Sequence, residues 1–204
     1  AVLGAGLLWF GWFGFNAGSA LSSGGIAASA FVATHLAAAS GAFTWMLLAW
    51  RDRRPSALGF ATGAVAGLAT ITPASGFVGP LAAIVIGAVA SIIGYYALLY
   101  RVRKGVDESL DAWAVHGMGG TFGVLSIGVF ASLAVNPDGA NGLLYGSAGQ
   151  LATQAIAAAA VIAYSLIGTY VLLKIVDATV GLRVAEEEEA VGLDLSQHGE
   201  RAYA

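Results

Sequence analysis

The sequence predicts an all-α membrane protein, built as a bundle of six transmembrane helices with a short cytoplasmic tail. Three observations support this fold class. Of the 204 residues, 58% are apolar and only 10% are charged, whereas a soluble domain of this size carries roughly a quarter charged residues. Six apolar stretches have lengths near the ~20 residues that cross a hydrocarbon core. The lysines and arginines gather beside alternate ends of these stretches.

The predicted spans follow one another through short connections. They are residues 1–21, 26–50, 57–72, 80–100, 112–134 and 149–176. Residues 1–177 are therefore expected to form the membrane region and residues 178–204 the tail. The third span is short because Pro73 limits the helix before it. Glycines at helical spacing, among them Gly67 and Gly87, predict close packing of helix against helix.

The positive charges predict the orientation. Cations follow the second, fourth and sixth spans, whereas the opposite connections, 22–25, 73–79 and 135–148, contain no Lys or Arg. With alternating crossings all nine cations lie on one face, which the positive-inside rule assigns to the cytoplasm. These cations are Arg51, Arg53, Arg54, Arg101, Arg103, Lys104, Lys174, Arg183 and Arg201. We therefore expect a multi-pass protein of the cell membrane with both ends of this chain in the cytoplasm.

Composition argues against several functional classes. The absence of cysteine excludes disulfides, thiolate metal sites and thiol catalysis. A net charge of -3 gives no indication of a nucleic-acid partner. Three histidines without a cysteine are a weak case for a metal site. Neither a metal nor another cofactor is therefore expected.

The fifth span carries His116 well inside its apolar run. An ionisable group at membrane depth is costly and usually faces the protein interior or a water-filled path. Two interpretations stay open for His116: a group that lines a pathway, or a histidine packed in a helix contact. For Asp111, at the start of this span, a favourable interaction with the helix N-terminus is a sufficient explanation. His35, in the second span, is expected to be a packing residue hydrogen-bonded to a neighbouring helix.

The first span carries a cluster of aromatic residues. Trp12, Phe15 and Ser19 are separated by three and four residues, so they lie on one helical face. An aromatic face beneath a hydroxyl suits a small cation, because the rings attract charge and the oxygen accepts a hydrogen bond. An interfacial aromatic belt is the alternative, but it does not explain the face shared with Ser19. Asn16, in the same segment, is expected to support this site.

The tail, residues 178–204, differs sharply in composition from the spans. It begins with the acidic run Glu186–Glu189. On composition alone, a solvated segment is the favoured interpretation. A docking surface for a cytosolic partner is the competing one.

Five segments occur in order along the whole chain. They are Gly11-Trp-Phe-Gly-Phe-Asn-Ala-Gly-Ser19, Thr72-Pro-Ala-Ser-Gly76, Asp111-Ala-Trp-Ala-Val-His-Gly-Met-Gly-Gly120, Val180-Gly-Leu-Arg-Val184, and Glu186…Gly-Leu-Asp194…Gln-His-Gly-Glu…Ala-Tyr203. Together they resemble the ammonium transporter family, and the tail segment resembles its microbial branch rather than the Rh proteins.

The resemblance implies a fold of eleven spans that forms homotrimers. In this fold two sets of five spans are related as an inverted repeat, with a substrate path between them in each protomer. This chain is similar to spans six to eleven, which are the second repeat, the last helix and the cytoplasmic tail. The family's first pore histidine, second gate phenylalanine, outer-site tryptophan and buried aspartate belong to spans one to five, outside this sequence.

The resemblance also implies roles for individual residues. His116 is similar to the second of two pore histidines, and Phe15 to a gate phenylalanine. Trp12 is similar to a pore-lining tryptophan, Ser19 to the hydroxyl of the outer ammonium site, and Asp111 to the acidic residue on the cytoplasmic side. In the tail, the resemblance implies contacts with neighbouring protomers and with a P-II-type signal protein through Gly192, Asp194, His198, Gly199, Glu200 and Tyr203.

The function that this resemblance implies is ammonium/ammonia transport. Ammonium is recruited at the outer site and loses its proton or its hydration shell. Ammonia then crosses an apolar pore, because a bare cation there faces a large desolvation cost. A membrane sensor on the same core is the alternative, which an added signalling domain would support. An intramembrane enzyme using His116 and Asp111 would need a nucleophile or metal, and no catalytic residue is expected.

Overall fold

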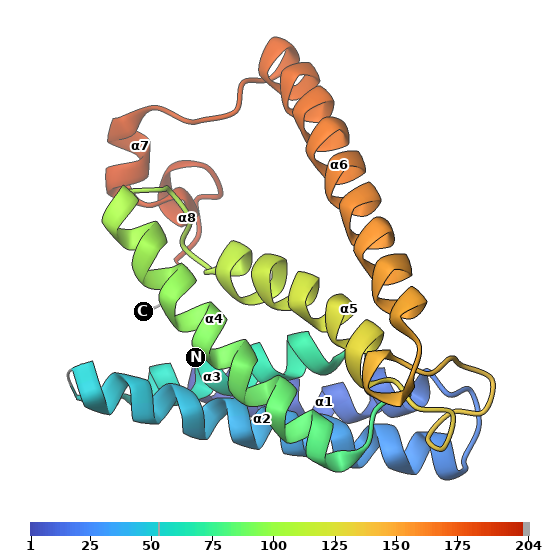
Figure 1. Ribbon diagram of the computed structural model, residues 1–204. Helices are drawn as coiled ribbons and strands as arrows, with labels where there is room; N and C mark the ends of the chain where they lie inside the picture. The colour runs from blue at the N-terminus through green and yellow to red at the C-terminus, as the bar shows by residue number, and fades with distance from the viewer. Residues whose placement is uncertain (53, 202–204) are drawn as a thin grey trace. The chain divides into compact units, whose positions relative to one another are not determined.

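The structure, a computed structural model, describes residues 1–52 and 54–201, and all its regular elements in these ranges are helices (Figure 1). Arg53 and Tyr203, both used in the sequence predictions, lie outside the described residues. The elements are α1 Val2–Gly18, α2 Gly25–Asp52, α3 Ala57–Ile71, α4 Pro80–Lys104, η1 Trp113–Met118, α5 Gly119–Phe130, η2 Leu143–Tyr145, α6 Ala148–Thr179, α7 Glu186–Val191 and α8 Leu193–Ser196.

The chain divides into two compact units, residues 1–158 and residues 159–204. The first unit holds α1 to α5 and the beginning of α6. The second unit holds the rest of α6 with the two short helices α7 and α8. A boundary between membrane region and tail at residues 177 and 178 stays a prediction, since α6 runs across it to Thr179.

Four helices in the described residues have the length and apolar composition needed to cross a membrane: α2, α4, η1 with α5, and α6. The helices α1 and α3 are shorter, with 17 and 15 residues. The prediction of an all-α membrane protein is confirmed by this architecture and by the comparisons below.

The fifth predicted span ends earlier than expected. Its helix stops at Phe130, and Ala131 is extended, with φ -62° and ψ 142°. From there the chain leaves the helix to bond other segments. The amide of Ser132 donates to the carbonyl of Phe77 at 3.0 Å, and the amide of Gly142 donates to that of Ala131 at 2.8 Å. The first bond holds Ser132 against the connection before α4, and the second closes the 131–142 segment on itself.

The core is formed by α2, α3 and α4, which approach each other through small residues. The Cβ of any residue placed at Gly67 or Gly87 would collide with the carbonyl of Ala37 on α2. Close approach of three backbones therefore depends on these glycines, as their spacing in the sequence predicts. The hydroxyl of Ser91 is buried in this contact and donates to the carbonyl of Gly41 at 2.6 Å.

Candidate functional site

One face of α1 presents the predicted aromatic and hydroxyl groups. The rings of Trp12 and Phe15 meet edge to face, with centroids 6.0 Å apart and planes at 90°. The indole Nε1 of Trp12 donates to the hydroxyl of Thr72 at 2.7 Å, which fixes that ring against the end of α3. Phe15 is 61% exposed, so its ring is free to bound an open space. The structure therefore brings these two residues together.

Ser19 lies directly after the last turn of α1. Its hydroxyl donates to the carbonyl of Phe15 at 2.6 Å, one helical turn back. This bond uses the proton of the hydroxyl and leaves oxygen lone pairs as acceptors. Ser19 can therefore accept a hydrogen bond from a donor such as an N–H group of a ligand.

Asn16 lies on a different side of α1 and is only 5% exposed. Its Nδ2 donates to the hydroxyl of Thr34 on α2 at 2.9 Å, and this hydroxyl donates to the carbonyl of Ala30 at 2.6 Å. Asn16 thus ties α1 to α2, and through this tie it supports the neighbouring residues Phe15 and Ser19.

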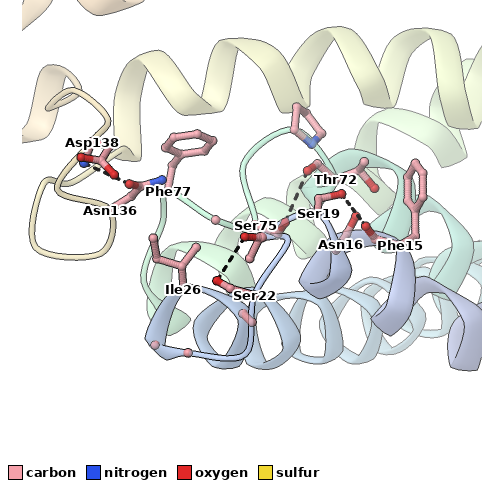
Figure 2. A pocket seen from close by; sticks show the side chains of 16 residues that line it. Phe15, Asn16, Ser19, Ser22, Ile26, Thr72, Ser75, Phe77, Asn136 and Asp138 are labelled. Carbon is pink, nitrogen blue, oxygen red and sulfur yellow. Dashed lines mark hydrogen bonds between the residues drawn. The ribbon is translucent and has the colours of Figure 1, made fainter.

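The end of α1 opens onto a hollow of about 450 Å³ (Figure 2). Phe15, Asn16 and Ser19 lie toward one end of this outer hollow, and Asn136 and Asp138 toward the other. Sequence reasoning missed Asp138 as a lining residue, although it is the single charged residue in the connections that lack Lys and Arg. It also missed Thr72, which was noted only within a motif, because the bond from Trp12 joins residues sixty positions apart.

His116 lies in a π-helical turn, η1, rather than in a regular α-helix. Such turns are rare and occur frequently at functional sites. The histidine is exposed, whereas its neighbours Ala114 and Val115 are buried. It lines a second hollow of about 490 Å³ together with Asp111 and with Ala1, Gly4, Ala5 and Leu8 of the first turns of α1. The imidazole therefore faces an open space beside α1.

A third hollow, of about 500 Å³, lies along α1 and shares lining residues with each of the other two. It shares Gly4 and Leu8 with the inner hollow around His116, and it shares Phe15 with the outer hollow around Ser19. Trp12 lines this middle hollow, whose lining has almost no polar surface. Leu8, Trp12, Phe15 and Ser19 recur every three or four residues, so one helical face borders all three hollows. We refer to this row of three hollows as the groove along α1. His116 and the aromatic groups lie at different positions along it.

Asp111 does not cap the helix with its side chain. Its carboxylate Oδ1 accepts from Nη2 of Arg101 at 2.7 Å. The carboxylate that accepts from a first-turn amide belongs to Glu108, whose Oε1 lies 2.7 Å from the amide nitrogen of Trp113. From the sequence, Arg101 was used only to predict the orientation and Glu108 was not singled out, because each is an ordinary charged residue next to a helix end.

His35 lies outside this groove. Its ring contacts two aromatic residues of α1, with centroids 5.4 Å from the ring of Trp9 and 6.0 Å from that of Phe13. Within residues 1–52 and 54–201, the imidazole of His35 makes these ring contacts and no hydrogen bond. The packing role expected for His35 therefore arises through aromatic contact and not through the expected hydrogen bond.

The tail forms two short helices held by local bonds. Arg183 donates from Nε and Nη2 to the two carboxylate oxygens of Glu189, at 2.7 and 3.0 Å. These bonds lower the pKa of Glu189 below its ordinary value, although partial desolvation acts in the opposite direction. Gly192, at the junction of α7 and α8, has φ 101° and Gly199 has φ 67°, both in the left-handed region that favours glycine.

The remaining tail residues lie close together in sequence. Asp194 is in α8, and its carbonyl accepts from the amide of Glu200 at 2.9 Å. His198 follows α8 and donates its amide to the carbonyl of Leu193 at 3.2 Å. This part of the tail is thus a compact loop and short helix.

No metal site is found in the part of the chain that the structure describes. Within residues 1–52 and 54–201, no three His, Cys, Asp or Glu side chains come together as a metal would require.

Comparison with known proteins gives a consistent answer. The model of the Ammonium Transporter Family matches residues 1–203. The ammonium transporter Amt1 of Archaeoglobus fulgidus is 53% identical over 202 residues, which is 99% of this chain and 51% of the relative. The crystal structure of Candida albicans Mep2 superposes with a TM-score of 0.86 and 37% identity, over 92% of this chain and 43% of that protein. A structure titled Sensor Amt Protein matches with a TM-score of 0.84 and 30% identity, over 96% of this chain and 48% of its own. The chain spans about half the length of the curated relatives it matches.

Proposed function

Because this chain belongs to the ammonium transporter family, we propose that it moves ammonium or ammonia across a membrane and supplies one wall of the substrate path. The observation that carries this proposal is the groove along α1, in which three adjoining hollows lead from Ser19 to His116. The lining residues differ between the three hollows, and those of each hollow suit a different step of transport.

The outer hollow suits recruitment of a small cation. Ser19 offers an acceptor oxygen, and Phe15 offers an aromatic ring that attracts positive charge. The rings of Trp12 and Phe15 meet edge to face, so the Phe15 ring bounds the space below Ser19. Ammonium, which carries four N–H donors and one charge, fits this combination of groups.

The middle hollow suits a neutral molecule better than a charged one. Its lining residues are Gly4, Leu7, Leu8, Gly11, Trp12 and Phe15. A bare cation there would lose its hydration shell without replacement, at a cost of several kcal/mol per ion. Ammonia does not meet this cost, so the middle hollow favours passage of ammonia over passage of the ammonium ion. His116 then offers ring nitrogens that can bond ammonia or hold a proton at the inner level.

The opposite wall of the path is expected from residues that this chain does not contain. The relatives are about twice as long, and the family resemblance assigns the first histidine and a second gate phenylalanine to their other half. A homotrimer, a cytoplasmic tail and docking of a P-II-type signal protein at the Gly192–Tyr203 segment belong to the same proposal. The cation groups at the ends of α2 and α4 support the cytoplasmic assignment.

A membrane ammonium sensor built on the same core is the second candidate. It is favoured by one observation, the match to a solved structure titled Sensor Amt Protein. Two curated relatives, 53% and 47% identical to this chain, are named as ammonium transporters, which favours transport.

The test is ammonium and methylammonium flux in proteoliposomes that hold the full-length protein. We compare the wild type with His116→Ala, which acts at the inner level, and Ser19→Ala, which acts at the outer level. Transport predicts that both variants change the flux or the selectivity of a wild type that conducts. Unchanged flux and selectivity in both variants would remove these residues from the path. A correctly assembled wild type without flux would instead favour the sensor.

A further inference from the structure

One arginine ties down the loop between α4 and the turn that holds His116. Arg101 lies in the last turn of α4, and its side chain is only 15% exposed. Its Nη1 donates to the carbonyl of Glu108 at 2.6 Å and to that of Val106 at 3.3 Å. Its Nη2 donates to Oδ1 of Asp111 at 2.7 Å. A single planar guanidinium thus holds three points of the loop that leads to η1.

The loop arrives at η1 in a constrained conformation. Asp111 has φ +55°, in the left-handed region that non-glycine residues rarely adopt. Such a conformation costs about 1–3 kcal/mol and persists only where the surroundings enforce it. Aspartate enters this region more readily than most residues, and the bond from Arg101 holds Asp111 in place here. A second contact acts at the same place, because Glu108 accepts from the amide of Trp113, the first residue of η1.

The position of His116 depends on where this turn begins. The carbonyl of Asp111 accepts from the amide of Val115 at 2.9 Å, so the first bond of the helix starts from the constrained residue. His116 is the next residue, and it lines the inner hollow together with Asp111. A change at Asp111 would rotate or shift the start of η1. The imidazole would move with it.

We propose that Arg101 is a positioning residue: through Asp111 it fixes the start of η1 and so sets where the His116 ring stands in the path. The expected effect on ammonium flux rests on the proposed transport function, whereas the effect on the position of the loop and of His116 does not. A half-buried ion pair is weak evidence for stability, since removing the charges from water offsets most of the attraction. The three-point geometry of Arg101 indicates that its contribution is to select one loop conformation.

The experiment uses the full-length protein with Arg101→Gln, Asp111→Asn and the double variant. Arg101→Gln removes the guanidinium, and Asp111→Asn removes the carboxylate charge that pairs with it, so the two variants weaken the same contact from opposite sides. We expect each to lower the maximal ammonium flux per folded transporter by about tenfold, the scale of one lost hydrogen bond to a charged group. The half-saturating ammonium concentration should stay within about twofold, because the outer site at Ser19 is untouched. The double variant should be no worse than Arg101→Gln, because the bond to Asp111 is one of the three that Arg101→Gln already removes.

Two comparisons separate positioning from a general loss of stability. Arg101→Lys keeps the charge but loses the planar guanidinium that donates to several acceptors, so its flux should fall between those of the wild type and Arg101→Gln. Arg51→Gln is the matched control, because Arg51 also ends a helix but has a 77% exposed side chain and lies 3.9 Å from Asp52. It should leave flux unchanged. Hydrogen exchange of residues 106–118 should accelerate in Arg101→Gln and not in Arg51→Gln.

The outcomes are distinct. Wild-type flux in Arg101→Gln, or additive losses in the double variant, would overturn the positioning role while leaving transport in place. A fall in the amount of folded protein, with unchanged flux per molecule, would also overturn it. If the wild type itself moves no ammonium, the proposed function fails. The hydrogen-exchange comparison then decides the inference, and equal exchange of residues 106–118 in both arginine variants contradicts it.

Discussion

Glycines recur both in the packed core of α2, α3 and α4 and on the open face of α1, but their surroundings differ. In the core, glycines remove side chains so that backbones touch, and Gly87 would collide with Ala37 if it carried a Cβ. On α1, glycines also recur, yet Gly4 and Gly11 have no atom within 4 Å of a Cβ placed there. The same residue type thus closes one region and leaves a groove in the other.

The serine hydroxyls of the two regions also differ in burial and in hydrogen bonding. Ser91 in the core is buried and its hydroxyl bonds a backbone carbonyl of another helix. Ser19 on α1 is exposed and bonds only its own helix. The hydroxyl of Ser91 is therefore used in packing, whereas the oxygen of Ser19 keeps acceptor capacity for a ligand. This difference supports the proposal that the face of α1 is the functional one.

The largest effect is expected from filling the core. Gly87→Leu should destabilise the protein by about 3 kcal/mol, because overpacking forces helices apart. The matched control is Gly168→Leu in α6, where nothing lies within 4 Å of an added Cβ; it should change stability by no more than about 0.5 kcal/mol. Thermal unfolding in detergent measures both. Equal melting temperatures would show that the core glycines are not close contacts.

The second largest effect on stability is expected from the hydrogen bond between Asn16 of α1 and Thr34 of α2. Asn16→Ala should cost about 1–2 kcal/mol, because it removes a buried hydrogen bond to Thr34. Thr34→Val and the double variant complete a cycle in which the two losses should overlap. Chemical or thermal unfolding gives the coupling. Strictly additive losses would mean that this bond does not hold the face of α1 in place.

A smaller effect is expected from the bond that orients the indole of the groove. Trp12→Phe keeps a ring but loses the donor to Thr72, which should cost about 1 kcal/mol. Trp50→Phe is the control, since Trp50 is 64% exposed. Only Trp12→Phe should also change the ammonium selectivity of flux. The same selectivity change in Trp50→Phe would argue that the indole position is irrelevant.

The smallest effect should come from the pH dependence of the tail. The pKa of Glu189 is lowered mainly by the hydrogen bonds from Arg183. A lowered pKa means that the pair contributes fully above the ordinary glutamate value and that its contribution is lost as pH falls through the lower folded value. Hydrogen exchange of residues 183–192 should therefore accelerate in acid. Glu189→Gln should remove this pH dependence, while Glu187→Gln should retain it; a persistent response in Glu189→Gln contradicts the assignment.

Sequence reasoning succeeded where local periodicity decides the outcome. The positions of the apolar helices, the close-packed glycines and the face shared by Trp12, Phe15 and Ser19 all follow from helical spacing. The early end at Phe130, the left-handed Asp111 and its pair with Arg101 did not follow. These features depend on contacts between separate elements, which one-dimensional spacing does not contain. The outer and inner hollows, which elements other than α1 help to line, depend on such contacts as well.

Obstruction of the groove tests the central claim most directly. Gly11 lines the middle hollow, and Gly6 lies on another side of α1 beside the ring of Trp9; neither has an atom within 4 Å of an added Cβ. The measurement is ammonium flux of full-length Gly11→Leu and Gly6→Leu in proteoliposomes at matched amounts of folded protein. We predict that Gly11→Leu abolishes flux and that Gly6→Leu conducts as the wild type does. Normal conduction by Gly11→Leu would contradict the assignment of this groove as a wall of the path.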